Sequence, residues 1–182
     1  MSPADRQRQS ARICERVRAL DQFRAVEIVL LYRSLPSEVD VAALWEQCRG
    51  ERRTVFAPRV DAATRDLRFI RVTEQTAWRA SAQGIWEPAT GDELTAELAA
   101  RATIIVPGIG FSYRGERMGR GAGYYDRALT KAPIGGCGYR VGVAFDAQVV
   151  ERLPVDSLDV PMHAVVAASN VWFPALPLGA VT

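Results

Sequence analysis

Short apolar runs rich in β-branched residues, separated by longer polar segments, constrain the fold of this chain most. The runs span residues 26–32, 53–57, 102–106, 139–145 and 163–168. Continuous apolar runs of this length are typical of strands that are buried on both faces of a parallel sheet. A further run at 67–72 is half polar, which predicts a strand nearer a sheet edge.

Helical patterns lie between these runs. We predict helices over 5–24, over 39–49 with Gly50 as C-cap, from an N-cap at Asp92 through Leu98, over 124–131 and over 147–153. Residues 73–91 have no regular pattern and predict an irregular region. Strands that alternate with helices imply crossover connections between parallel strands. The prediction is one α/β domain over residues 1–182, a three-layer α/β/α fold with a mostly parallel sheet.

The composition narrows the class of protein. Apolar residues make up 48% and charged residues 24% of the 182 positions, which is ordinary for a globular domain. The net charge of +2 is too balanced for a dedicated nucleic-acid or membrane-surface protein. Cys14, Cys48 and Cys137 lie far apart and fit reduced thiols. We therefore expect a cytoplasmic protein, by default a monomer, with small-molecule partners and neither nucleic acid nor membrane.

A glycine-rich stretch from Gly108 to Gly123 precedes the helix predicted at 124–131 and carries the chemistry. Gly119, Gly121 and Gly123 alternate, so backbone N–H groups can approach an anion without a Cβ in the way. The helix N-terminus adds unpaired N–H groups. Lys131 is the only lysine among the 23 basic residues. A basic side chain that binds phosphate here is therefore expected to be an arginine.

The glycine spacing by itself does not decide the function. The stretch is not a Walker A loop, and its third glycine comes one residue too early for the dinucleotide fingerprint. This spacing disfavours a nicotinamide-dependent oxidoreductase. On the residues alone, a phosphate-binding loop and a tight turn that needs positive φ have about even support.

Several segments together resemble the 5-formyltetrahydrofolate cyclo-ligases, also named 5,10-methenyltetrahydrofolate synthetases. The run MGRGAGYYD at 118–126, preceded by VPGIGF at 106–111, is similar to the family signature. Three further segments resemble family motifs in the right order, at 32–40, 84–88 and 153–166. The resemblance implies a doubly wound fold like that of sugar-phosphate isomerases and CoA-transferases. It also implies ATP- and Mg²⁺-dependent conversion of 5-formyltetrahydrofolate to 5,10-methenyltetrahydrofolate, with release of ADP and phosphate.

The resemblance also assigns roles to residues. Arg120 and Tyr124 would act in catalysis, and Asp126 and Asp159 would hold Mg²⁺. Arg33, Glu38, Trp86 and Tyr124 would bind the folate. The ATP phosphates would be bound by Arg117, Gly119, Arg120, Gly121, Ala122, Gly123, Tyr124 and Tyr125.

Other interpretations of single residues remain open. Without the family, Asp159 is a turn residue before Pro161, and Glu38 is an acid in the first turn of a helix. Trp86 and the two tyrosines could instead pack against the protein. His163, the only histidine, is interpreted as structural.

Two departures from the family pattern bear on activity. The resemblance places Met1 after the basic helix with which the family usually begins, and Ala122 stands where many members have lysine or glycine. An alternative function is therefore a relative of the same fold that binds nucleotide or folate without turnover, or that has a different specificity.

Overall fold

The computed structural model describes residues 1–81, 84–154 and 159–175. The helices are α1 (Pro3–Ala19), α2 (Asp21–Arg24), α3 (Ala42–Gly50), α4 (Ala96–Ala100) and α5 (Tyr124–Thr130), with short 3₁₀ turns η1 (Ile134–Gly136) and η2 (Asp146–Gln148). The strands are β1 (Ile28–Leu30), β2 (Thr54–Val60), β3 (Leu67–Val72), β4 (Trp78–Ala80), β5 (Trp86–Pro88), β6 (Ala102–Val106), β7 (Gly110–Ser112), β8 (Arg117–Met118), β9 (Tyr139–Val143), β10 (Val149–Val150), β11 (Ala164–Val166) and β12 (Val171–Trp172).

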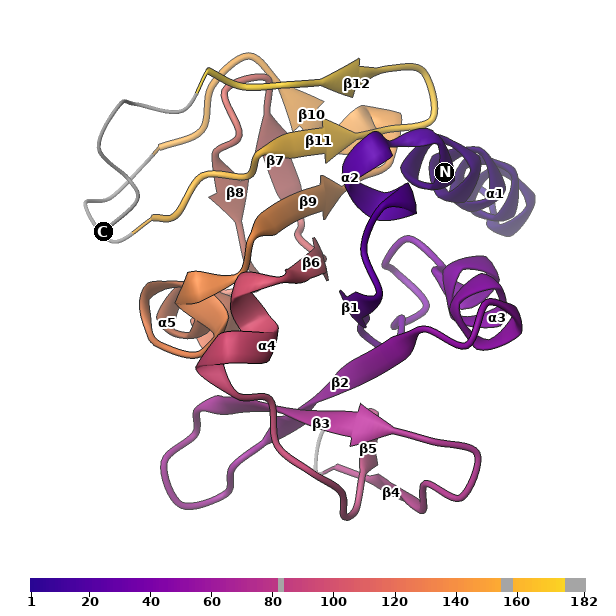
Figure 1. Ribbon diagram of the computed structural model, residues 1–182. Helices are drawn as coiled ribbons and strands as arrows, with labels where there is room; N and C mark the ends of the chain where they lie inside the picture. The colour runs from indigo at the N-terminus through magenta and orange to yellow at the C-terminus, as the bar shows by residue number, and fades with distance from the viewer. Residues whose placement is uncertain (82–83, 155–158, 176–182) are drawn as a thin grey trace.

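Within the described residues, the central sheet has seven strands in the order β12-β11-β9-β6-β1-β2-β3. The five inner strands run parallel, and β3 and β12 pair antiparallel at the two edges. Figure 1 shows α1 and α3 on one side of this sheet and α4 and α5 on the other. The predicted mostly parallel three-layer α/β fold is thus confirmed, as is the edge position of the strand at 67–72.

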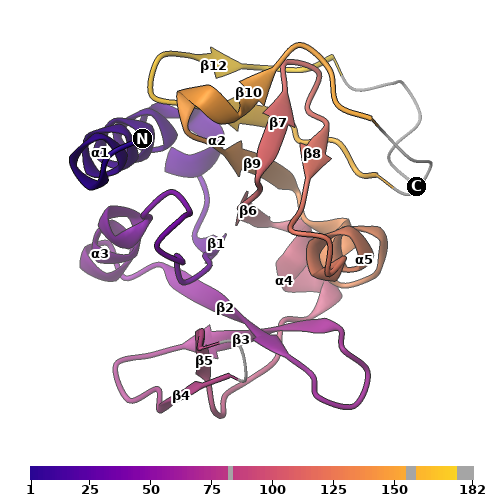
Figure 2. The ribbon, with the colours of Figure 1, turned by 180° about the vertical axis from the view of Figure 1, so that it is seen from behind.

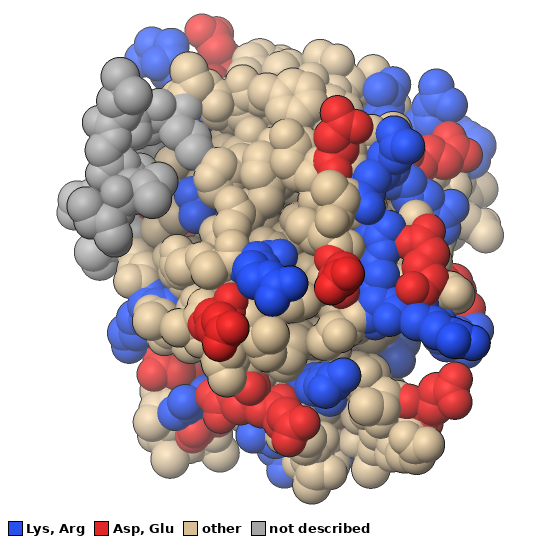
Figure 3. Space-filling model, viewed as in Figure 1, with Lys and Arg blue, Asp and Glu red and all other residues tan. Residues whose placement is uncertain are grey.

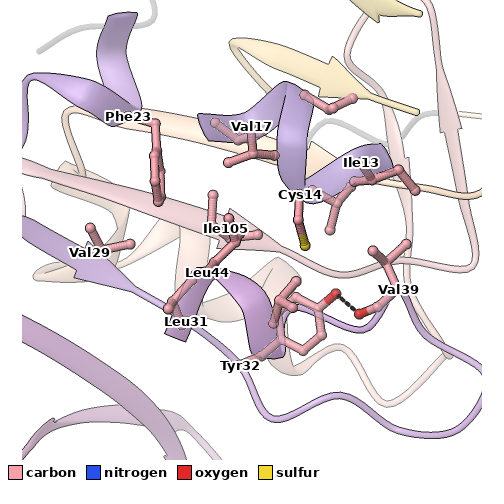
Figure 4. Packing of buried hydrophobic residues seen from close by; sticks show 14 of the residues in the cluster. Ile13, Cys14, Val17, Phe23, Val29, Leu31, Tyr32, Val39, Leu44 and Ile105 are labelled. Atoms are coloured by element: carbon pink, nitrogen blue, oxygen red, sulfur yellow. Dashed lines mark hydrogen bonds between the residues drawn. The ribbon is translucent and has the colours of Figure 1, made fainter. Parts of the chain in front are cut away.

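Each face of the sheet has its own apolar core because side chains alternate along the strands. Val29 and Leu31 pack with α1, α2 and α3, whereas Ile28 and Leu30 pack with α4 and α5. Figure 4 shows the first of these cores, in which the Tyr32 hydroxyl donates a hydrogen bond to the Val39 carbonyl oxygen at 2.7 Å.

The loop that follows β1 is tied down along its length. Besides the Tyr32 bond, the Val41 N–H donates to Ser34 Oγ at 3.1 Å, and the Asp40 N–H donates to Ser10 Oγ on α1 at 3.0 Å. A loop whose backbone is bonded at both ends holds its remaining side chains in fixed positions. Glu38 lies on this loop.

Several predicted boundaries were wrong at the N-terminal helices and at β2. The helix predicted over 5–24 is two helices, because the backbone is extended at Leu20. Gly50 is the last residue of α3, and the left-handed backbone comes two residues later, at Arg52. Strand β2 continues through Pro58. Beyond Phe56 it pairs only with β3, and the missing N–H of Pro58 faces the side where β1 has already ended.

Other errors lie in the second half of the chain. Thr95, not Asp92, caps the helix before β6, since its side chain accepts the Leu98 N–H. The helix predicted over 147–153 is wrong, because Val149 and Val150 form β10 and pair with β7. The irregular region at 73–91 contains the antiparallel pair β4–β5, and the glycine-rich stretch contains β7 and β8. The strand β12 was not predicted.

Figure 2, from behind, shows β7, β8 and β10 as a small separate sheet beside the central one. On the face drawn in Figure 3, acidic and basic residues lie beside one another along the right side and the lower half, whereas the upper middle is largely uncharged. In the described part of the chain, no helix is both long and apolar enough to cross a membrane.

Candidate active site

A pocket lies beyond the carboxyl ends of β1 and β6. Sheet order reverses between these two neighbours, since the chain runs from β1 toward β3 and later from β6 toward β11. Ligands of open α/β sheets bind at such a switch point. The pocket is lined by Tyr32, Arg33, Leu35, Glu38, Pro58, Val60, Leu67, Ile85, Trp86, Glu87, Pro107, Gly108, Arg117, Gly119, Arg120, Ala122, Gly123, Tyr124, Tyr125 and Asp126.

The glycine loop connects β8 to α5 along one wall of this pocket. Gly121 and Gly123 have φ of +87° and +68°, in the region that favours glycine. No side chain caps the α5 N-terminus, where Gly123 is the N-cap. The left-handed turns expected for this loop are therefore present. Gly121 is the only residue expected to bind phosphate that does not line the pocket.

Arg117 is buried beneath the loop, where its guanidinium contacts three protein groups. Its side chain is 5% exposed. The guanidinium donates to the Pro107 carbonyl oxygen at 3.2 Å, forms an ion pair with Asp126 and lies over the Tyr125 ring. These contacts hold the start of α5 against the segment after β6. Arg117 thus positions the loop, and its two terminal nitrogens already donate to protein acceptors.

Two tyrosines begin α5 and line the pocket. The Tyr125 hydroxyl is buried without a hydrogen-bond partner among the described residues. Burial, together with the nearby Glu38 carboxylate, raises the pKa of Tyr125, so this hydroxyl stays protonated at neutral pH and can donate a hydrogen bond. Tyr124 lies under the Arg127 guanidinium, 5.5 Å from its ring centre. A buried polar atom without a partner at a pocket wall is suited to bind a ligand.

Glu38 and Arg120 meet across the pocket. Glu38 Oε1 lies 3.4 Å from Arg120 Nε, and Glu38 Oε2 accepts the Leu35 N–H at 2.9 Å. Arg120 also donates to the Ser37 hydroxyl. The Glu38 side chain is 12% exposed and that of Arg120 is 47% exposed. The residue expected to bind folate and the residue expected to bind phosphate are therefore direct neighbours.

The folate-side prediction omitted two aromatic residues. The Arg33 guanidinium lies over the rings of both Trp45 and Trp78, 4.8 Å and 4.3 Å from their centres. Trp86 is 58% exposed at the rim of the pocket. Trp45 falls within the helix predicted over 39–49, and Trp78 falls within the irregular region predicted over 73–91. No local signal marks them, because tertiary folding brings α3 and β4 together.

Glu87 was also missed, although it lies in a segment that resembles the family. It is buried at 4% exposure, and its carboxylate accepts the Val60 N–H at 3.2 Å. The bond holds β5 against the end of β2 and places Trp86 at the pocket rim.

The two residues expected to bind Mg²⁺ differ in their position relative to the pocket. Asp126 lines the pocket, whereas Asp159 is not among the lining residues. No cluster of three or more potential metal ligands occurs among the residues that the structure describes. The shared metal site of Asp126 and Asp159 therefore stays a prediction. His163 lies apart from the pocket, stacked on Tyr139 at 4.9 Å and accepting the Arg140 N–H at Nδ1.

Known proteins identify the family. The family model described as 5-formyltetrahydrofolate cyclo-ligase matches residues 1–168. The chain belongs to the 5-formyltetrahydrofolate cyclo-ligase family. The family's Escherichia coli K12 enzyme of that name is 28% identical over 176 residues, which cover 94% of each chain. The Haemophilus influenzae enzyme is 30% identical over 148 residues, which cover 79% of this chain and 76% of that one.

Solved cyclo-ligase structures agree. The 5,10-methenyltetrahydrofolate synthetase of Aquifex aeolicus matches with a TM-score of 0.78 and 29% identity, covering 98% of this chain and 90% of that chain. The Mycoplasma pneumoniae synthetase matches with a TM-score of 0.69 at 20% identity, which bears on the fold. The chain is thus a cyclo-ligase family enzyme with the family's α/β architecture.

Proposed function

We propose that this chain uses ATP to close 5-formyltetrahydrofolate to 5,10-methenyltetrahydrofolate, releasing ADP and phosphate in a Mg²⁺-dependent reaction. One observation carries the proposal: a single pocket at the switch point of the sheet is lined both by the glycine loop with Arg120 and by Arg33, Glu38 and Trp86. Joining two substrates requires that both sets of contacts face the same space.

The phosphate side of the pocket is the loop from Gly119 to Gly123. Its glycines let backbone N–H groups face an anion, and Arg120 supplies a guanidinium that is about half exposed. Arg117 supports this side by holding α5 in place. Tyr124 and Tyr125 stand where the two substrates would meet, and the unpartnered Tyr125 hydroxyl is available to one of them.

The folate side is the loop after β1 together with the rim residue Trp86. A carboxylate such as Glu38 accepts two adjacent N–H groups, which is the pattern that the pterin ring presents. Glu38 is held in place by the Leu35 N–H, so the carboxylate is oriented before substrate binds. The exposed Trp86 ring is suited to cover a flat heterocycle.

The reaction needs little covalent help from the protein. The formyl oxygen attacks the γ-phosphorus of ATP, ADP leaves, and N10 of the folate then attacks the activated formyl carbon. Phosphate departs with the former formyl oxygen as the methenyl bridge forms. The protein aligns the two substrates, neutralises phosphate charge with Arg120 and loop N–H groups, and limits the access of water.

The Asp126 side chain fits a Mg²⁺ ion held jointly with phosphates. One of its oxygens is engaged by Arg117, and the other has no protein donor in the described part of the chain. Mg²⁺ is commonly held by one or two carboxylates together with substrate phosphates and water. Asp126, with Asp159 as the second candidate, would hold the ion, which would supply positive charge at the phosphates.

The test measures the ratio of phosphate released to methenyltetrahydrofolate formed. Purified protein with 5-formyltetrahydrofolate, ATP and Mg²⁺ should release one phosphate for each methenyltetrahydrofolate formed, and none without the folate. ATP binding with no phosphate release in the presence of folate would contradict the proposal and would support a non-catalytic relative.

A further inference from the structure

A second, open cavity adjoins the pocket, and Arg33 on its wall forms no ion pair with any residue that the structure describes, although Asp40 lines the same cavity. We name the side chains of Arg33, Trp45 and Trp78 the tryptophan niche. The guanidinium lies over both indole rings, and the two rings meet edge to face with centres 6.1 Å apart. The niche joins the loop after β1 to helix α3 and strand β4.

Arg33 has unused hydrogen-bonding capacity. Its side chain has no hydrogen bond and no carboxylate partner in the described part of the chain, although a guanidinium carries five N–H donors. The contacts with the two indole rings leave its N–H groups without a protein acceptor among the described residues. A carboxylate takes two N–H groups from one edge of a guanidinium in one plane. The niche is thus preorganised for an anion.

The niche is continuous with the pocket. Arg33, Leu35, Ile85 and Trp86 line both the pocket and the cavity beside it, whose wall also includes Trp45 and Trp78. The pocket has a volume of about 150 Å³ and the adjoining cavity about 530 Å³. Sites for ligands of drug size usually measure about 300–1,000 Å³. A ligand of that size seated in the pocket has room to extend into the adjoining cavity and reach the niche.

The far side of the niche is also basic. A third cavity there is lined by Arg33, Trp45 and Trp78 together with Arg49, Arg52 and Arg53, and by two acidic residues, Glu46 and Glu74. Arg49 is paired with Glu46 and Arg53 with Glu51. Arg52 has no side-chain partner among the described residues. The cations that remain free, Arg33 and Arg52, favour a ligand with negative charge at its outer end.

We propose that the tryptophan niche binds the benzoylglutamate end of the folate, with the Arg33 guanidinium paired to a glutamate carboxylate. This inference rests on the proposed function and adds Trp45 and Trp78 to its binding surface. Trp86, shared by the two cavities, covers the benzoyl ring between the pterin in the pocket and the carboxylates at the niche.

The test compares two substrates, 5-formyltetrahydrofolate and the same compound without its glutamate, 5-formyltetrahydropteroate. With wild-type protein, kcat/KM for the glutamate-bearing substrate should be about tenfold or more higher, as expected for one charge-assisted pair. Arg33→Ala should abolish that preference, because kcat/KM should fall about tenfold more for the glutamate-bearing substrate than for the truncated one. Arg33→Lys should restore part of the preference, since lysine keeps the positive charge but lacks the paired N–H donors of a guanidinium.

Arg101→Ala is the matched control. It removes the same charge from the C-cap of α4, across the sheet from the niche, and should leave the preference unchanged. A preference that persists in Arg33→Ala, or an equal loss for both substrates, overturns the proposal.

A binding measurement separates this inference from the proposed function. Calorimetry should detect p-aminobenzoylglutamate binding to wild type and a loss of about tenfold in affinity in Arg33→Ala, whereas p-aminobenzoate should bind both proteins equally weakly. Absence of turnover with either folate would contradict the proposed function alone. Equal binding of p-aminobenzoylglutamate by both proteins would overturn the proposal that the niche binds the glutamate.

Discussion

Glu38 and Arg120 form an ion pair between two loops that lie far apart in the sequence, with Oε1 and Nε 3.4 Å apart. The pair joins the loop after β1 to the glycine loop before α5, so the two halves of the site share one pocket. It also means that each residue is positioned by the other. Substitution of either one therefore tests the arrangement as well as the individual role.

Arg120→Ala should raise the KM for ATP by about tenfold to a hundredfold, because a charge-assisted hydrogen bond to phosphate contributes about 1.5–3 kcal/mol. Initial rates at saturating folate measure this. Arg114→Ala, an exposed arginine in the turn between β7 and β8, is the control and should leave the KM unchanged. An unaltered KM in Arg120→Ala would remove this residue from the phosphate site.

Glu38→Gln should weaken the binding of folate more than the binding of ATP. Glutamine keeps an oxygen that can accept the Leu35 N–H, but loses the charge and one acceptor for the pterin. We expect the KM for folate to rise about tenfold and the KM for ATP to change less than threefold. An equal rise in both, with a lowered melting temperature, would mean that the variant disturbs the loop instead.

Asp126→Asn should raise the Mg²⁺ concentration needed for half-maximal activity by about tenfold, since an amide is a much poorer ligand for a hard cation. The asparagine oxygen still accepts from Arg117, so the melting temperature should fall only modestly. Asp21→Asn, at the 90% exposed Asp21 side chain, is the matched control. If Asp126→Asn and wild type give the same Mg²⁺ titration, Asp126 is not a ligand.

Stability should fall in acid through His163. Burial first, and then the neighbouring Arg140, lower the pKa of His163 from its usual 6.5 to about 4. Between these two pH values the unfolded chain binds a proton that the folded chain does not, so protonation favours unfolding as the pH falls. Protonation at Nδ1 would also end its acceptance of the Arg140 N–H.

Urea unfolding at pH 7 and pH 5 measures this effect. Wild type should lose more stability between the two values than His163→Asn, whose side-chain oxygen can take the place of Nδ1. Because the chain has a single histidine, the difference between the two proteins reports on this residue. Parallel losses would show that His163 contributes nothing to the pH dependence.

The inner strands were predictable because a strand buried on both faces must be apolar throughout. The run at 102–106 is buried at every position of β6, and the half-polar run at 67–72 is an edge strand. Elements with no such requirement were missed. Val149 and Val150 pair with β7 over two residues, and nothing local distinguishes that pairing from a helical turn.

The candidate site likewise has features that the local sequence indicates and features that it does not. The glycine loop is local, so the sequence alone raised a turn with positive φ as one of two interpretations, and such a backbone is found at Gly121 and Gly123. The engagement of Arg117 by Asp126 and the stacking of Arg33 on Trp45 and Trp78 depend on contacts between separate elements. Tertiary contacts of that kind leave no periodic signal in the sequence.

The most direct test of the account is the ATP-dependent appearance of methenyltetrahydrofolate absorbance from 5-formyltetrahydrofolate and Mg²⁺ with this 182-residue chain. The account predicts sustained turnover that requires ATP and is strongly reduced in Arg120→Ala at limiting ATP. A folded protein that binds both substrates and forms no methenyl product would contradict it.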